Sequence, residues 1–226
     1  MLYKTRGIVL NFIKYRETSI IVRIYTEQFG LTSYIVNSVR SKKSKNKIAL
    51  FQPLTLLDLV VYNRKSSNLN RISEMKCAVP FSEIPTNIKK SSIALFMTEM
   101  LVKTLKGEEG NAQLFDFLYQ SILMLEHMES EYENFHLQFI LKLARYLGFA
   151  PQSAEEILHQ VHGAVAKQTD ELQQLDELLK LSYQEKVEVT NAMRRNLLIK
   201  ILDFYRLHVD ALGEVKSLTV LHAVLN

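Results

Sequence analysis

The sequence predicts an α+β protein in which a small β-barrel is followed by an α-helical bundle. Residues 1–80 contain five apolar runs rich in β-branched and aromatic residues, and turn signals separate these runs. Residues 81–226 instead repeat apolar residues at helical spacing. The charge changes at the same boundary, because residues 1–80 hold 14 Lys and Arg against 4 Asp and Glu, whereas the remainder holds 14 against 20. We therefore expect two domains, residues 1–80 and 81–226.

The overall composition is that of a globular protein. Among 226 residues, 47% are hydrophobic and 23% are charged, which argues against disorder. No apolar run approaches the roughly 20 residues of a transmembrane helix. The N-terminus leads directly into a strand pattern, so we expect no signal peptide. Cys77 is the only cysteine, so a disulfide framework and a multi-cysteine zinc site within one chain are excluded. We expect a cytoplasmic protein that does not engage a membrane.

The first domain contains five short strands with turn signals between them. Phe29-Gly30 offers one such turn, between the second and third strands. Five strands within about 80 residues suit a small closed or partly open barrel, and the OB-fold is the natural candidate. The expected strands cover residues 7–13, 19–25, 31–39, 50–62 and 69–79.

The helices of the second domain are marked by local capping signals. The first covers residues 88–106 and ends at Gly107, and an apolar stripe over 135–147 ends at Gly148. Residues 153–156 have the spacing of a capping box and open a more polar segment. The expected N-terminal caps of the other helices are Asn111, Thr169, Thr190 or Asn191, and Ser217.

The densest basic segment is residues 40–47, with five Lys and Arg in eight positions. Flexible cationic loops beside a barrel suit phosphate contacts, because they neutralise the nucleic-acid backbone without reading its sequence. The alternative is a solvated loop tip without a ligand. The candidate DNA-binding residues are Arg6, Lys14, Arg16, Arg23, Arg40, Lys42, Lys43, Lys45, Lys47, Arg64, Lys65 and Arg71.

Five aromatic residues are interleaved with these charges. They could stack on nucleic-acid bases if they face outward, and they belong to the barrel core if they face inward. The sequence leaves both placements open. The five are Phe12, Tyr15, Tyr25, Phe29 and Tyr34.

A smaller basic cluster lies on the long helix near the C-terminus. One interpretation is a set of ordinary surface pairs with neighbours such as Asp203. The other is a site that grips an acidic C-terminal peptide whose aromatic tip enters an apolar groove. The candidate partner-peptide residues are Arg194, Arg195, Lys200 and Arg206.

Neither catalysis nor a metal site is predicted. The sequence has no phosphate-binding glycine loop and no G-x-S-x-G elbow, and Cys77 has no evident activating partner. The carboxylates of residues 126–133 resemble a solvated helix end. His159 and His162, with Glu155 and Glu156 nearby, could in principle bind zinc, but such a pair is common by chance. We therefore expect no enzyme activity, no metal and no cofactor.

Short segments in a particular order and spacing over nearly the whole chain carry a family resemblance. They are residues 7–10, 15–17, 25–27, 50–54, 69–74, 114–118, 147–151, 205–208 and 216–218, together with Gly30. The basic loop after Arg40 and the sequence of residues 194–218 add to them. Taken together, these features resemble the RecO family of bacterial recombination mediators.

The resemblance implies an N-terminal OB-fold, a helical C-terminal domain and a non-catalytic role in DNA repair. Such proteins bind single- and double-stranded DNA, anneal complementary strands and work with RecR. They also engage the acidic C-terminal tail of the single-strand DNA-binding protein and help load the RecA recombinase, which implies a nucleoid-associated location in the cytoplasm. The alternatives from other classes are a protein-interaction scaffold, whose basic loop docks an acidic protein partner, and a metal-dependent nuclease.

One departure from the family pattern concerns zinc. Many members carry a four-cysteine zinc site soon after the segment that matches residues 147–151. The corresponding stretch here, residues 152–181, contains no cysteine. We therefore expect no structural zinc, and residues 152–185 take the place of the family's zinc-binding insertion.

Overall fold

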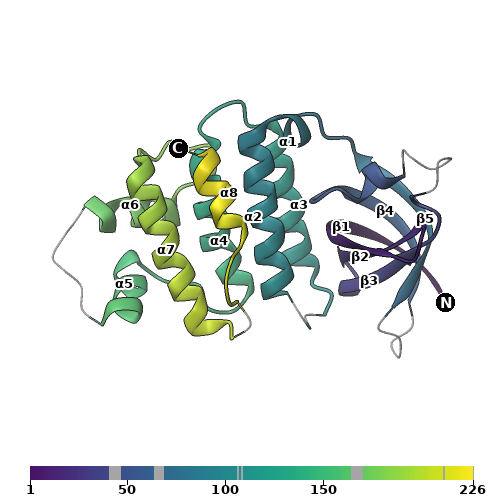
Figure 1. The fold of residues 1–226 in the computed structure, drawn as a ribbon. Helices are drawn as coiled ribbons and strands as arrows, with labels where there is room; N and C mark the ends of the chain where they lie inside the picture. Colours follow the sequence, from purple (N-terminus) through teal and green to yellow (C-terminus); the bar gives the residue numbers. More distant parts are fainter. Residues whose placement is uncertain are drawn as a thin grey trace. The chain divides into compact units, whose positions relative to one another are not determined.

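The computed structural model describes residues 1–40, 47–63, 69–105, 107, 109–163, 170–210 and 212–225. The chain divides into two compact units, whose elements are labelled in Figure 1. The first unit comprises Met1–Ser82 and Leu105–Leu123, and the second comprises Glu83–Thr104 and Met124–Asn226. Within the described residues, no helix is long and apolar enough to cross a membrane.

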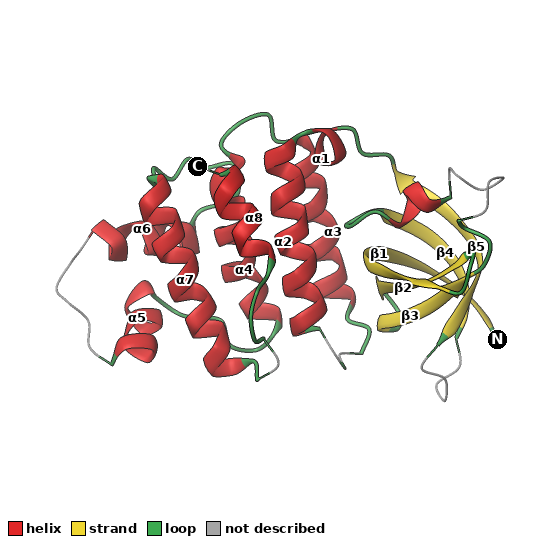
Figure 2. Cartoon of the chain, in the orientation of Figure 1, coloured by secondary structure: helices red, strands yellow, loops and turns green. Residues whose placement is uncertain are grey.

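The first unit is built on a closed barrel of five strands in the order β1-β2-β3-β5-β4 (Figure 2). The β3–β5 pair is parallel and the other neighbouring pairs are antiparallel. This barrel, followed by a helical region, confirms the predicted fold class and fits an OB-fold. The strands are β1 (Leu2–Tyr15), β2 (Ser19–Thr26), β3 (Gly30–Val36), β4 (Leu56–Tyr62) and β5 (Asn70–Val79).

The barrel core follows from strict alternation along the strands. On β2, Ile20, Val22 and Ile24 are fully buried in the core cluster, so the residues between them face outward. Burying each such side chain contributes about 1.5–3 kcal/mol. Gly7 lies where β1 crosses this core, and a Cβ atom there would be 2.7 Å from side-chain atoms of both Ile24 and Leu59. Only glycine fits this position without displacing its neighbours.

The predicted strand over residues 50–62 was wrong at its start. Ile48–Phe51 forms a 3-10 helix, and Leu54 adopts a left-handed φ of 63° before β4 begins. The strand begins late because residues 54 and 55 form hydrogen bonds with β1, which is remote in the sequence. The Leu54 N–H donates to Val9 O at 2.7 Å, and the Val9 N–H donates to Thr55 O at 3.0 Å.

The first part of helix α3 (Ala112–His127) belongs to the barrel's unit. Asn111 caps this helix as predicted, because its Oδ1 accepts the Leu114 N–H at 3.0 Å. Phe115 then stacks on Tyr25 with the ring centroids 6.4 Å apart. Tyr25 points out of the barrel and is nevertheless fully buried. The helix therefore covers one end of the outer face of β2.

The second unit is helical. The predicted caps Ser153 and Thr190 are confirmed, since their side-chain oxygens accept the N–H groups of Glu156 and Met193, each at 3.2 Å. The predicted cap Thr169 lies outside the described residues. The elements are α1 (Glu83–Thr86), α2 (Ile88–Thr104), the end of α3, η3 (Tyr132–Asn134), α4 (Phe135–Tyr146), α5 (Ala154–His162), α6 (Asp170–Lys180), α7 (Asn191–His208) and α8 (Ser217–Val224).

Helix α8 is not capped by Ser217, contrary to the prediction. Its N-cap residue is Lys216, which makes no side-chain capping bond. Glu99 on α2 performs this role instead, because its carboxylate accepts the N–H groups of Lys216 at 3.0 Å and Ser217 at 2.8 Å. A negative charge at this end also complements the helix dipole.

Candidate nucleic-acid interface

The outer face of β1, β2 and β3 carries an exposed, unpaired arginine. The strand register places Asn11, Arg23 and Ser33 side by side across the three strands. Arg23 is exposed, since its neighbours Val22 and Ile24 point into the core. No ion pair among the described residues involves Arg23. Its full charge is therefore available to a polyanion.

The barrel topology brings Arg71 to the same outer face. Arg71 pairs with Ile35 on β3 and with Tyr62 on β4, and its side chain is exposed. Ile35 alternates with the buried Tyr34, so the Ile35–Arg71 row faces outward. Arg23 and Arg71 are 48 positions apart in the sequence, and only the closed barrel places both on one face.

Two further arginines meet at the turn between β1 and β2. The Arg40 Nη1 donates to Arg16 O at 3.3 Å, and the Arg40 N–H donates to Thr18 O at 3.0 Å. Both arginine side chains are exposed, and the Arg16 guanidinium lies 5.2 Å from the centroid of the Tyr15 ring. Lys14 and Lys47 are exposed as well. The predicted residues Lys42, Lys43, Lys45, Arg64 and Lys65 lie outside the described residues.

Arg6 differs from the other predicted DNA-binding residues. Its Nε and Nη2 donate to the two carboxylate oxygens of Glu27 at 2.9 and 2.8 Å, and Nη2 also donates to Asp116 Oδ1 at 2.8 Å. The hydrogen bond to Glu27 raises the pKa of Arg6, and the same bond lowers the pKa of Glu27. The guanidinium also lies over the rings of Phe115 and Tyr119. Arg6 therefore joins α3 to the barrel, and we remove it from the candidate phosphate contacts.

The aromatic candidates divide into core and surface residues. Tyr25 and Tyr34 are fully buried, so they cannot stack on bases without unfolding. Phe12 and Phe29 are partly buried against the barrel core. Tyr15 is partly exposed beside Arg16.

Tyr62 is a surface aromatic residue that the sequence reasoning missed. It is 47% exposed and lies opposite Arg71. A signal for it was present in the sequence, because the alternation of Leu57, Leu59 and Val61 toward the core turns Tyr62 outward.

An open groove of about 460 Å³ lies over the outer face of β1, β4 and β5. Its charged residues balance one another, which makes it a poor site for phosphates. The basic members are Lys4, Arg6 and Lys76, and the acidic members are Glu27, Asp58 and Glu74.

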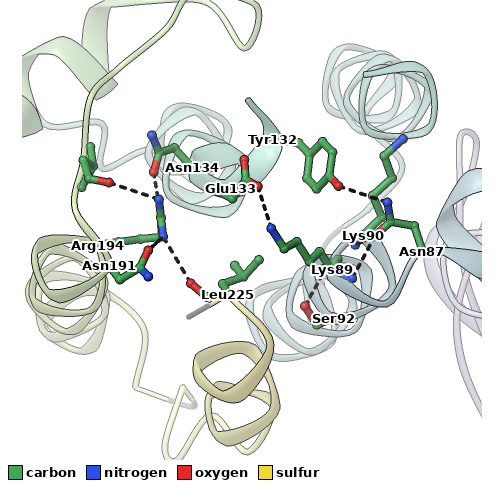
Figure 3. Close-up of polar contacts among 11 residues, drawn as sticks. Asn87, Lys89, Lys90, Ser92, Tyr132, Glu133, Asn134, Asn191, Arg194 and Leu225 are labelled. Atoms are coloured by element: carbon green, nitrogen blue, oxygen red, sulfur yellow. Dashed lines mark hydrogen bonds and ion pairs between the residues drawn. The ribbon is translucent and has the colours of Figure 1, made fainter. Parts of the chain in front are cut away.

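Not every residue of the predicted peptide site on α7 is available to bind a ligand. Arg194 is buried, and its guanidinium donates to Asn191 Oδ1, Asn134 Oδ1, Val189 O and Leu225 O at 2.7, 2.8, 3.2 and 3.3 Å (Figure 3). Burial lowers the pKa of Arg194. Its donors hold the start of α7 to the end of α8, so we remove Arg194 from the candidate peptide contacts.

The other three cations of α7 are exposed to different degrees. Lys200 pairs with Glu171 at 2.7 Å, and each side chain is only 17% exposed. Arg206 pairs with Asp203 one turn earlier on the same helix. Arg195 is exposed, pairs with no carboxylate of the described chain, and donates to His222 O at 3.4 Å. Arg195 is therefore the residue of this set that is best placed to meet an acidic ligand.

Residues 152–185, which we predict to take the place of a zinc-binding insertion, do not fit a zinc site. It has no cysteine, and among the described residues no group of three or more His, Cys, Asp and Glu could hold a metal. Direct side-chain contacts anchor α5 and α6 instead. Asp176 accepts the Ala154 N–H at 2.8 Å, and Ile157, Leu175 and Leu178 are fully buried.

Comparison with known proteins agrees with this architecture. Residues 1–81 match the family model described as Recombination protein O N terminal, and residues 85–161 match the one described as Recombination protein O C terminal. The DNA repair protein RecO of Flavobacterium johnsoniae is 35% identical to this chain over the whole of both sequences. The RecO proteins of Phocaeicola vulgatus and Bacteroides fragilis are each 37% identical, with 98% of each chain covered. The chain therefore belongs to the RecO family of DNA repair proteins.

Proposed function

We propose that this member of a DNA repair family acts as a non-catalytic recombination mediator that binds single- and double-stranded DNA and promotes strand annealing. The observation that carries the proposal is a group of exposed cations on the strands and loops of the barrel, none of which forms an ion pair within the described part of the chain. Its described members are Lys14, Arg16, Arg23, Arg40, Lys47 and Arg71. We call this group the basic rim.

Phosphate neutralisation is sufficient for annealing. Two complementary strands repel each other, and a cationic surface lowers this repulsion without covalent chemistry. Each phosphate contact releases counterions, so log K should fall with log salt by about 0.9 per contact on duplex DNA and about 0.7 on a single strand. Six contacts from the basic rim would thus give a slope near −5 on duplex DNA, which is about a 1000-fold loss of affinity between 50 and 200 mM salt.

Partner binding belongs to the same proposal. We assign RecR and the acidic tail of the single-strand DNA-binding protein as partners, with RecA engaged indirectly through loading. The exposed Arg195 on α7 supports the tail assignment, because Ile199 follows it by one helical turn and is 48% exposed. A cation beside an apolar side chain suits an acidic peptide with an apolar end.

The test of DNA binding is fluorescence anisotropy with labelled DNA across a salt series. Variants with Lys42, Lys43, Lys45 and Lys47 changed to Ala, and with Arg23→Gln, should weaken binding and flatten the salt slope. Lys180→Gln is the matched control, because Lys180 is an exposed cation in the second unit. An affinity of the wild type that barely changes with salt would contradict the electrostatic mechanism.

Experiments with the same protein and labelled DNA distinguish this proposal from two rival functions. If the wild type binds no DNA, the basic segment would instead dock an acidic protein, as a scaffold. Incubation of labelled DNA with Mg²⁺ or Mn²⁺ should leave the DNA intact. Turnover would replace the mediator proposal with a nuclease.

A further inference from the structure

A small cavity lies between α4, α7 and α8 of the helical unit. Its volume is about 10 Å³, which is room for one water-sized particle and too little for a peptide. Three leucines form the apolar part of its lining, and none of the described residues that line it carries a carboxylate. The polar lining residues are His136 on α4, Asn191, Arg194 and Arg195 on α7, and His222 on α8.

Two imidazole nitrogens at this cavity have no hydrogen-bond partner. His136 is 1% exposed, and no described residue bonds to its Nδ1. The Nε2 of His222 is also buried, and it has no partner in the described part of the chain. Buried polar atoms are normally hydrogen-bonded, to protein, water or an ion. Two such atoms at one cavity therefore indicate a bound particle that completes their bonding.

The cavity also adjoins a buried positive charge. Arg194 is 8% exposed and forms no ion pair within the described residues. Its hydrogen bonds use four of the five N–H groups of the guanidinium, and all four acceptors are neutral oxygens. A buried charge is normally paired with a counterion, because burial without one is unfavourable. The neighbouring Arg195 adds a second unpaired cation.

The charges around the cavity act on its histidines in the same sense. Burial lowers the pKa of His136, and Arg194 and His222 lower it further. Burial likewise lowers the pKa of His222, and Arg195 adds to this effect. The nearest carboxylate that acts on Arg194 is that of Glu133, which pairs with Lys89 at 3.0 Å and does not line the cavity. The lining is therefore positive and lacks an anion of its own.

We propose that this cavity binds one small inorganic anion of the size of chloride, as the counterion of Arg194 and Arg195. The anion accepts hydrogen bonds from the guanidinium groups and from an imidazole N–H, and such charge-assisted bonds are strong. A water molecule also bonds to the imidazoles, but it brings no negative charge. Because the lining comes from α4, α7 and α8, the anion holds these three helices together. The site belongs to the helical unit and does not depend on DNA binding.

The first experiment is urea unfolding of the full chain, followed by circular dichroism, as chloride replaces gluconate at constant ionic strength. Gluconate is too large for the cavity. The test variant is Arg195→Gln, since Arg195 is exposed and its replacement leaves the helix core intact. Arg145→Gln is the matched control, because Arg145 is an exposed arginine on α4 that does not line the cavity. Arg195→Lys keeps the charge and should retain a chloride dependence.

An anion that binds only the folded chain lowers the equilibrium constant of unfolding in proportion to its concentration, once that concentration exceeds the dissociation constant. We expect about a tenfold decrease for each tenfold rise in chloride in the wild type and in Arg145→Gln. Arg195→Gln should show no chloride dependence and should match the wild type without chloride. An equal dependence in all three proteins would be a general salt effect and would overturn the site, as would no dependence in any of them.

The second experiment places the anion directly. Crystals grown with bromide in place of chloride should give an anomalous peak inside the cavity, within hydrogen-bond distance of an arginine N–H. The same crystals of Arg195→Gln should lack this peak. A cavity that holds only water in the wild type would overturn the proposal.

Discussion

Replacing Arg194 with methionine should destabilise the second unit by about 3 kcal/mol and leave DNA affinity unchanged. The guanidinium makes four hydrogen bonds, of which the one to Leu225 O is buried. Losing a buried bond to a charged donor costs about 1.5–3 kcal/mol. The other three bonds are partly buried, so water replaces part of each, and we assign them about 0.5 kcal/mol each. Methionine fills part of the volume without offering a donor.

The assay is urea unfolding followed by circular dichroism, and Arg195→Met is the matched control. Arg195 is the next residue on the same helix and is exposed, so its replacement should change the free energy of unfolding by less than about 0.5 kcal/mol. Arg195→Met should instead weaken the binding of an acidic peptide. If Arg194→Met unfolds like the wild type and loses only peptide binding, the structural role assigned to Arg194 is refuted.

Three further predictions concern the same unit. Burial lowers the pKa of His136 to about 3, so only the unfolded state takes up a proton as the pH falls below about 6.5. The free energy of unfolding should therefore drop by up to about 1.4 kcal/mol per pH unit. His136→Leu should remove this dependence in unfolding curves measured between about pH 4 and 7. Lys200→Met should lower the free energy of unfolding in urea by about 1–2 kcal/mol, because it breaks the ion pair with Glu171. Addition of a metal chelator should not shift the urea unfolding curve of the wild type. Glu99→Ala should lower the free energy of unfolding by about 1–2 kcal/mol and increase amide hydrogen exchange at the start of α8, and unchanged exchange there would contradict the capping role.

The His136 prediction depends on what surrounds the imidazole. Arg194 and His222 both lower the pKa of His136 in addition to burial, since a second positive charge nearby is unfavourable. Phe96 packs against the imidazole with the ring centroids 5.8 Å apart. A hydrogen bond with the Glu133 backbone favours the protonated form, but it is the smallest of these effects, so the pKa of His136 stays lowered. The pH dependence should therefore persist in Lys200→Met, which lies outside this cluster.

Much of the fold could be predicted because it is encoded locally. The β-branched and aromatic residues of 19–25 predicted a strand from adjacent residues alone, and the structure has β2 there. The caps Ser153 and Thr190 bond N–H groups three residues away, so short sequence windows contain the whole motif. The excess of positive charge in residues 1–80 likewise needs no tertiary information.

The roles of individual site residues were decided by tertiary contacts. Arg6 resembled the other barrel cations in sequence, but Asp116, which lies 110 residues away, engages its guanidinium. Arg194 resembled Arg195, but a carbonyl 31 residues away accepts its hydrogen bond in the protein interior. Tyr25 faces outward as its strand dictates, and a helix from another part of the chain covers it.

The sequence by itself determined the order of barrel and helices, the segregation of positive charge and the family resemblance. Tertiary structure decided which outward-facing residues stay exposed. The physical reason is that alternation and capping depend on neighbours within a few residues, whereas the free charge of a cation depends on which carboxylate or carbonyl the folded chain brings to it. The β3–β5 pair, which joins segments remote in the sequence, is what places Arg71 beside Ile35 on the outer face of the barrel.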